Sequence, residues 1–291
     1  MNNTIDILRK VREIEIRSRR LSANIFAGAY HSAFKGRGMV FSEVREYAYG
    51  DDMRDIDWNV TARFGRPYVK VFEEERELTV MLLVDVSGSL DFGTTMRTKR
   101  QLTTEIAATI AFSALANNDK TGVIFFSDHI EKYIPAKKGR KHALYIIREM
   151  LEMQPTSSKT DIGAALEFLS QVMKRRCTAF LLSDFYTTLP YDNQLMMCNR
   201  KHDLGAIQVY DRRARQLPNI GMMHVRDAES GETMLVDTSS RQLRQAYRQY
   251  ADKLQQHTVS TFAHTGVDYV SIATDDDYVR LLKRMFEQRR H

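Results

Sequence analysis

The sequence has few cysteines and no long apolar run, and both absences narrow the class of protein. Only two cysteines, Cys177 and Cys198, occur in 291 residues, which is too few for a disulfide framework. We therefore expect reduced thiols in a cytoplasmic protein. The most apolar stretches, residues 80–84 and 106–116, are shorter than the roughly 20 residues of a membrane helix, so we expect no membrane span. The first twenty residues carry charge throughout, unlike a secretory signal.

The motifs of several common enzyme classes are also missing. The sequence has no GxxxxGK[ST] loop for ATP and no GxSxG elbow for a nucleophilic serine. Phosphoryl-transfer enzymes of the haloacid dehalogenase type need a second aspartate two residues after the first, and Ser87 stands in that position after Asp85. We therefore expect a protein that is not an enzyme. A metal-dependent hydrolase that uses Asp85 and Asp184 remains the alternative.

The charge balance is basic without being extreme. The formal net charge is +6, with 27% charged and 43% hydrophobic residues, which is ordinary for a globular chain that buries a core. Basic residues gather in four short clusters, at residues 17–20, 137–141, 212–215 and 289–290. No aromatic residues alternate with them as in a stacking surface for bases. We interpret these clusters as solvated faces and expect no nucleic-acid partner.

The first 76 residues form one predicted accessory segment. Ile7, Val11, Ile14 and Leu21 recur at helical spacing, which predicts an amphipathic helix packed on the body of the protein. Glycines at 36 and 38 end this pattern, and short apolar pieces separated by turn signals follow, which indicates β structure.

Residues 77–291 alternate between strand and helix patterns. The run LTVMLLVD ends in Asp85 and has the unbroken apolar character of a strand that is covered on both faces. Further strands are predicted in TGVIFFSD, TAFLLSD, DLGAIQVYD and VDYVSIAT, with helices between them. This alternation predicts an α/β fold with a doubly wound, mostly parallel sheet and helices on both faces. A hairpin insertion is expected at about residues 211–238.

Polar side chains follow three of the predicted elements. Asp85, Ser87 and Ser89 follow the first strand of this domain, Thr160 precedes a helix, and Asp184 follows a later strand. Ligand sites of doubly wound sheets lie at the carboxyl ends of the strands, where we expect these five residues to meet. Carboxylates and hydroxyls without thiolate or imidazole suit a small hard cation, Mg²⁺ or Mn²⁺. Because two carboxylates neutralise such a site poorly, it has room for another anionic oxygen.

This pattern resembles the metal-ion-dependent adhesion site of von Willebrand factor A-like domains. It matches in order as well as in residue type, with Asp-x-Ser-x-Ser at 85–89, then Thr160, then Asp184. The resemblance implies that Ser87, Ser89 and Thr160 contact the metal and that Asp85 and Asp184 bind directly or through water. It also implies a protein partner that offers an acidic residue to the metal. The acidic run Asp51, Asp52, Asp55 and Asp57 is a competing source of that oxygen within the chain.

A second resemblance covers nearly the whole chain. The stretch from GRGMVFSEVREYAYGDDMRDIDW to LTVMLLVDVSGSL is similar to the bacterial domain-of-unknown-function family fifty-eight. Members of that family have an A-type domain behind such an N-terminal block and occur alongside MoxR-type AAA+ ATPases. The resemblance implies a chaperone-like adaptor that works with such an ATPase in the maturation or remodelling of other proteins.

Overall fold

The chain divides into two compact units. The computed structural model describes residues 9–16, 18, 40–73, 78–94, 97–187, 189–228 and 231–289. Residues 35–77 form one unit, and residues 1–34 together with 78–291 form the other. This division differs from the predicted accessory segment of residues 1–76, because the N-terminal helix belongs with the larger unit.

Contacts of the N-terminal helix explain that difference. Residues 9–16 and 18 are helical, and Val11 is buried in one apolar cluster with Phe112 of helix α4 (Lys99–Ala116) and Ile147 of helix α5 (Arg140–Glu152). The Glu15 carboxylate accepts a hydrogen bond from Arg140 Nε at 2.7 Å. The helix therefore packs on the body, as its amphipathic pattern predicts; the predicted positions Ile7 and Leu21 lie outside the described residues.

The smaller unit is built on a two-stranded antiparallel ribbon. Strand β1 (Val40–Glu46) pairs with β2 (Tyr68–Glu73), with a bulge between Phe41 and Glu43. The connection contains a short 3-10 helix η2 (Met53–Asp55) and helix α3 (Trp58–Phe64). The Asp57 side chain caps the first turn of α3, and Gly65, at φ 69°, ends the helix. The β structure predicted for this segment is present.

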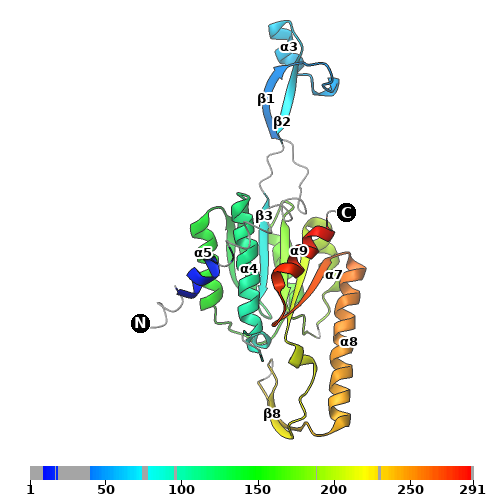
Figure 1. Ribbon diagram of the computed structural model, residues 1–291. Coiled ribbons are helices and arrows are strands. Elements are labelled where there is room, and N and C mark those ends of the chain that lie inside the picture. The colour runs from blue at the N-terminus through cyan, green and yellow to red at the C-terminus, as the bar shows by residue number, and fades with distance from the viewer. Residues whose placement is uncertain are drawn as a thin grey trace. The chain divides into compact units, whose positions relative to one another are not determined.

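The larger unit contains a six-stranded sheet with the order β10-β7-β6-β3-β4-β5 (Figure 1). Its strands are parallel except β5, which pairs antiparallel with β4 at one edge. The strands are β3 (Thr79–Asp85), β4 (Lys120–Phe126), β5 (Ile130–Lys137), β6 (Thr178–Ser183), β7 (Asp203–Tyr210) and β10 (Asp268–Ala273). The predicted doubly wound, mostly parallel sheet is confirmed.

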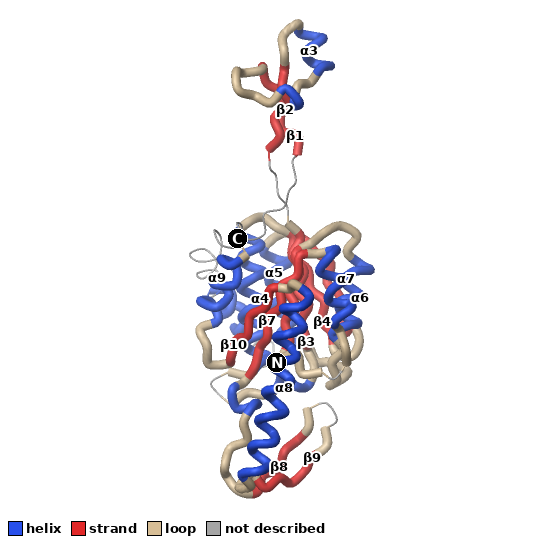
Figure 2. Tube along the Cα trace, turned by 90° about the vertical axis from the view of Figure 1, so that its right-hand side faces the viewer, coloured by secondary structure: helices blue, strands red, loops and turns tan. Residues whose placement is uncertain are grey.

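Helices cover both faces of this sheet, so alternate residues of β3 enter two different cores. Val80, Leu82 and Val84 pack on one face, with α4, α5 and α9 (Tyr278–Gln288). Met81 and Leu83 pack on the other face, with α6 (Ile162–Val172), α7 (Asp192–Lys201) and α8 (Arg241–Thr265). Figure 2 shows α4, α5 and α9 on one side of the strands and α6 and α7 on the other. Burial on both faces explains the unbroken apolar run of β3.

A hairpin interrupts the alternation between β7 and α8. Strands β8 (Met222–Arg226) and β9 (Thr233–Asp237) pair antiparallel, within the predicted insertion of residues 211–238. Gly231 lies at φ 74° in the connecting turn, a conformation that glycine adopts without a steric penalty. None of the described helices is both long and apolar enough to cross a membrane.

Cys177, Cys198 and His202 form a buried group near the amino ends of β6 and β7. Both cysteines are free thiols. His202 is fully buried, and its Nδ1 accepts a hydrogen bond from the Cys177 backbone N–H at 3.4 Å. Burial, reinforced by the charges of Lys201 and Arg176, lowers the pKa of His202 to about 4. The folded chain therefore keeps this imidazole neutral in a pH range where an unfolded histidine, with a pKa of about 6.5, takes up a proton.

We expect His202 to make the fold less stable as the pH falls from about 6.5 to about 4, because the unfolded state binds the extra proton. His202→Leu should flatten the decline in melting temperature over this range, measured by circular dichroism. The exposed His257→Leu serves as the control and should keep the wild-type slope. Parallel curves for all three proteins would contradict the assignment.

Candidate metal centre

The predicted site residues come from three segments that end at one edge of the sheet. Asp85 is the last residue of β3, and Asp184 directly follows β6, which pairs parallel with β3. Thr160 precedes α6, and its neighbour Asp161 donates its backbone N–H to the carbonyl of Ser127, which follows β4, at 2.8 Å. Because β6, β3 and β4 are adjacent and parallel, all three segments lie at the carboxyl edge of the sheet.

Asp85 is a buried carboxylate with two donors. The residue is only 1% exposed. Its carboxylate accepts hydrogen bonds from the Ser87 backbone N–H at 2.9 Å and from Ser183 Oγ at 2.5 Å. Burial and the nearby charge of Asp184 together raise the pKa of Asp85 to about 6, in spite of those two bonds. The ionised form of Asp85 is therefore disfavoured in the free protein, and a bound cation would stabilise it.

Asp184 is paired with a lysine that the sequence reasoning missed. The Lys99 ammonium, on the first residue of α4, lies 2.6 Å from Asp184 Oδ2, and both side chains are nearly inaccessible at 7% and 3%. Asp184 Oδ1 accepts the Tyr186 backbone N–H at 3.1 Å. The edge thus holds two buried carboxylates and one fixed positive charge. A lysine at a helix start gives no sequence signal of this role.

The hydroxyl groups complete the oxygen set. Ser87 Oγ and Ser89 Oγ lie 3.2 Å apart. Thr160 is 3% exposed, and its hydroxyl has no hydrogen-bond partner within the described part of the chain. A buried hydroxyl without a partner costs about 1–3 kcal/mol, so a structure seldom retains one without a ligand for it. Hydroxyl and carboxylate oxygens are the donors that Mg²⁺ and Mn²⁺ prefer, so these residues fit such an ion.

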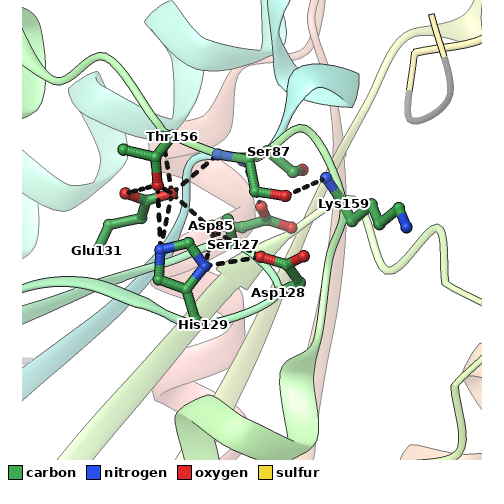
Figure 3. Close-up of polar contacts among 9 residues, drawn as sticks. Asp85, Ser87, Ser127, Asp128, His129, Glu131, Thr156 and Lys159 are labelled. Atoms are coloured by element: carbon green, nitrogen blue, oxygen red, sulfur yellow. Dashed lines mark hydrogen bonds and ion pairs between the residues drawn. The ribbon is translucent and has the colours of Figure 1, made fainter.

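A second polar network, also absent from the sequence predictions, holds the loop that leads to Thr160 (Figure 3). The nearly buried Glu131 carboxylate accepts Ser127 Oγ at 2.7 Å and the Thr156 backbone N–H at 2.9 Å. Burial acts to raise the pKa of Glu131, but the hydrogen bonds from Ser127 and Thr156 outweigh it and lower that pKa. His129 adds a contact from Nε2 to Thr156 Oγ1 at 3.0 Å. Glu131 thus fixes the loop between α5 and α6.

Two backbone features shape the loops around the carboxylates. Phe185 adopts φ 57°, which is rare for a residue with a side chain and costs on the order of 1 kcal/mol; its ring packs edge-on against Phe262 at 5.0 Å. Gly88 has no room for a side chain, since a Cβ there would lie 2.6 Å from the Ala228 carbonyl oxygen and 3.0 Å from Ser158 Cβ. The turn of the β8–β9 hairpin therefore lies against the Asp85–Ser89 loop.

The acidic run of the smaller unit has partners of its own. Asp51 forms two 2.7 Å contacts with the Arg45 guanidinium. Asp52 caps η2, and Asp57 caps α3 and lies 3.6 Å from Lys70 Nζ. The sequence analysis left these aspartates as alternative ligands of the metal within the chain. To bind the metal, they would have to give up these contacts. Among the described residues, no group of three His, Cys, Asp or Glu side chains could hold a metal.

Sequence comparison identifies the family. The model described as "Protein of unknown function DUF58" matches residues 43–257. The chain belongs to the DUF58 family. An uncharacterized protein of Mycobacterium tuberculosis strain H37Rv is 30% identical to this DUF58 chain over 284 residues, which cover 96% of this chain and 89% of the relative. An uncharacterized protein of Mycobacterium avium is 28% identical over 159 residues, covering 54% of this chain and 94% of the relative.

Comparison with solved structures found chains that are similar to this DUF58 chain over most of its length. An aerotolerance-related membrane protein from Bacteroides fragilis aligns with a TM-score of 0.50 and 14% identity, covering 72% of this chain and 99% of that one. The conserved hypothetical protein BatB from Bacteroides thetaiotaomicron aligns with a TM-score of 0.48 and 13% identity, covering 73% and 98%. At such identities the likeness concerns the fold.

The Lys99–Asp184 pair leads to a stability prediction. Lys99→Met leaves the Asp184 carboxylate buried without its cation, and we expect a loss of about 3–5 kcal/mol of unfolding free energy at neutral pH. Urea denaturation in EDTA measures this loss. The control Lys253→Met, on the exposed face of α8, should change stability by less than about 0.5 kcal/mol. The double variant Lys99→Met, Asp184→Leu should recover much of the loss; a Lys99→Met protein as stable as wild type would refute the pairing.

Proposed function

We propose that this DUF58 protein is a metal-dependent protein-binding module. Asp85, Ser87, Ser89, Thr160 and Asp184 would hold Mg²⁺ or Mn²⁺, with Asp85 and Asp184 acting directly or through water. When bound, the ion supplies a Lewis-acidic position for a carboxylate oxygen from a partner protein. The remainder of the proposal concerns what the residues of this chain contribute.

The observation that carries the proposal is the unpartnered, buried hydroxyl of Thr160. It lies at the same edge of the sheet as two buried carboxylates and the adjacent hydroxyls of Ser87 and Ser89. A structural role alone would leave the Thr160 oxygen without compensation, whereas a cation would use it. The Glu131 network supports this interpretation, because it orders the Thr160 loop in advance of any ligand.

Lys99 gives a physical reason for an acidic partner. Its ammonium already offsets one of the two carboxylate charges at the edge, so a divalent ion would bring one positive charge in excess. An anionic oxygen from outside the site balances that charge. We therefore expect a partner that presents an aspartate or glutamate.

The family resemblance suggests which partner to test first. We propose an AAA+ ATPase of the MoxR type, with this chain as a chaperone-like adaptor in the maturation or remodelling of other proteins. The two buried free thiols agree with a cytoplasmic site of action, which is part of the same proposal.

We propose binding rather than catalysis at this edge. Ser87 Oγ is next to Ser89 Oγ, and among the described residues no histidine is hydrogen-bonded to it, so it lacks the base that a nucleophilic serine needs. Asp184 is held in an ion pair, which lowers its value as a general base. A metal-dependent release of phosphate from a phosphoester by the purified chain would support the hydrolase alternative instead.

The metal assignment predicts a loss of binding in one variant. Asp85→Ala should abolish calorimetric binding of Mg²⁺ while the circular dichroism spectrum stays that of the wild type, because the change lies at the carboxyl end of β3 and empties no apolar core. Glu287→Ala, on an exposed position of α9, is the control and should bind as the wild type does. Equal Mg²⁺ affinity in Asp85→Ala and the wild type would exclude Asp85 as a ligand.

The partner assignment predicts a metal requirement. A tagged wild-type chain should co-purify an AAA+ ATPase in Mg²⁺, lose it in EDTA and regain it when Mg²⁺ is restored. Ser89→Ala should retain less of the same ATPase, because one direct oxygen ligand is lost while the fold persists. Capture that continues undiminished in EDTA, with removal of the metal verified, would mean that the interaction uses another surface.

A further inference from the structure

An arginine-rich groove runs along α8 beside the candidate metal centre. Two open hollows, of about 560 Å³ and about 510 Å³, share Gln216, Leu217, Arg248 and Asp252 in their lining and so form one continuous groove. One wall is the segment from Tyr210 to Pro218, and the other is the first half of α8. The basic cluster at 212–215, which the sequence analysis assigned to a solvated face, lies in this wall.

The arginines of the groove keep their charge available. Within the described residues, Arg213 and Arg241 have no hydrogen-bond or ion-pair partner for their guanidinium groups. Arg244 donates to the carbonyls of Thr238 and Ser239, at 2.5 and 2.8 Å, and forms no ion pair with a described carboxylate, although its charge acts on nearby Asp237. Arg248 has a distant contact, 3.9 Å from Asp252. Arg212 is different, because Asp275 and Asp276 pair with it at 2.8 and 2.6 Å.

The wall from Tyr210 to Pro218, which bears Arg213, is rigidly built. The buried Asp211 carboxylate caps the 3-10 helix η4 (Arg212–Arg215) and also accepts hydrogen bonds from Thr94, with N–H and Oγ1 both at 2.8 Å. The Arg215 guanidinium carbon lies 3.7 Å from the centre of the Tyr210 ring, and the group donates to the Gln255 side chain at 2.8 Å. The groove is therefore formed before any ligand arrives, which reduces the entropy cost of binding.

The groove lies beside the candidate metal centre. Tyr210 and Arg215 line the first hollow and also a small pocket, of about 30 Å³, whose wall includes Lys99 and Asp184. The groove and the Asp184 side of the candidate metal centre are therefore separated by the Tyr210 and Arg215 side chains that they share. Arg215 covers one face of the Tyr210 ring, so that face is closed to base stacking, which favours a peptide over a nucleic acid.

We infer that this groove binds an acidic peptide segment of the partner, with several carboxylates pairing with Arg213, Arg241, Arg244 and Arg248 while one carboxylate reaches the metal centre. This inference rests on the proposed function and extends it, since it assigns the partner a run of acidic residues rather than a single one. Guanidinium groups recognise carboxylates in a planar, two-bond geometry that suits such a run.

The test uses a fluorescein-labelled oligoglutamate peptide and the full chain, with binding followed by fluorescence anisotropy at low salt in Mg²⁺ and again in EDTA. The double variant Arg213→Glu, Arg248→Glu should bind the peptide at least about tenfold more weakly than the wild type in both buffers, because two charge-assisted contacts are replaced by repulsion. The double variant Arg280→Glu, Arg284→Glu, on exposed positions of α9, changes the net charge by the same amount and should bind as the wild type does. Circular dichroism verifies that all three proteins are folded.

The two buffers separate this inference from the proposed function. Weaker binding by the double variant in both buffers supports the groove, even if EDTA has no effect on the wild type and the metal proposal fails. Equal binding by the double variant and the wild type overturns the groove, even if EDTA weakens both and the metal proposal stands. An equal loss in Arg280→Glu, Arg284→Glu also overturns it, because net charge alone would then explain the result. An oligothymidylate that displaces the peptide at lower concentration would assign the groove to nucleic acid.

Discussion

Repulsion between two buried carboxylates sets the arrangement of the carboxyl edge. Asp85 ends β3 and Asp184 follows the adjacent strand β6, and both strands are covered on both faces, so water cannot screen these two carboxylates. Their negative charges must be compensated by nearby groups of the chain. Lys99 supplies a full charge to Asp184, whereas Asp85 receives only neutral donors from Ser183 and from the Ser87 backbone. Burial is the main cause that raises the pKa of Asp85, the nearby charge of Asp184 raises it further, and these neutral donors offset the rise only in part.

The same requirement extends into the loops and explains why they are so polar. A loop that approaches a charged edge has to offer hydroxyl or amide dipoles, and the loop before α6 does so through Thr156, Ser157 and Thr160. Glu131 holds that loop by accepting hydrogen bonds from Ser127, Thr156 and Ser157. The left-handed backbone at Phe185 is tolerated next to Asp184 because the ring is anchored in the core. The polar contacts at the edge thus depend on the apolar packing beneath it.

The fold could be predicted from the sequence because its signals are local. A strand such as β3, buried on both faces, needs an apolar residue at every position, and an aspartate that follows such a run marks the strand end. The same logic located Asp184 after β6, whereas Thr160 was located before a predicted helix. The N-terminal helix was predicted as an element, but its place in the larger unit was not, because that place depends on Val11 and Glu15 meeting α4 and α5.

The missed features of the site depend on contacts between residues distant in sequence. Lys99 and Asp184 are 85 positions apart, and Glu131 and Thr156 are 25 apart. A lysine at a helix start or a glutamate in an edge strand is ordinarily exposed to solvent, so neither residue stands out in the sequence. The arginine cluster was visible, but its interpretation as a plain solvated face overlooked the wall that α8 supplies. The sequence shows that arginines are present, but only the fold shows whether arginines from two segments lie along the same groove.

The close approach of the hairpin turn to Gly88 has a consequence for how the family can diverge. A side chain at position 88 would clash mainly with the Ala228 carbonyl, which belongs to the hairpin insertion. It would clash less severely with Ser158 of the neighbouring loop. Residue choice at 88 is therefore tied to the length and path of the β8–β9 hairpin. A relative that shortens the hairpin gains freedom to place a small side chain there, whereas one that retains it must keep glycine. The two segments are expected to covary across the family as one inherited unit.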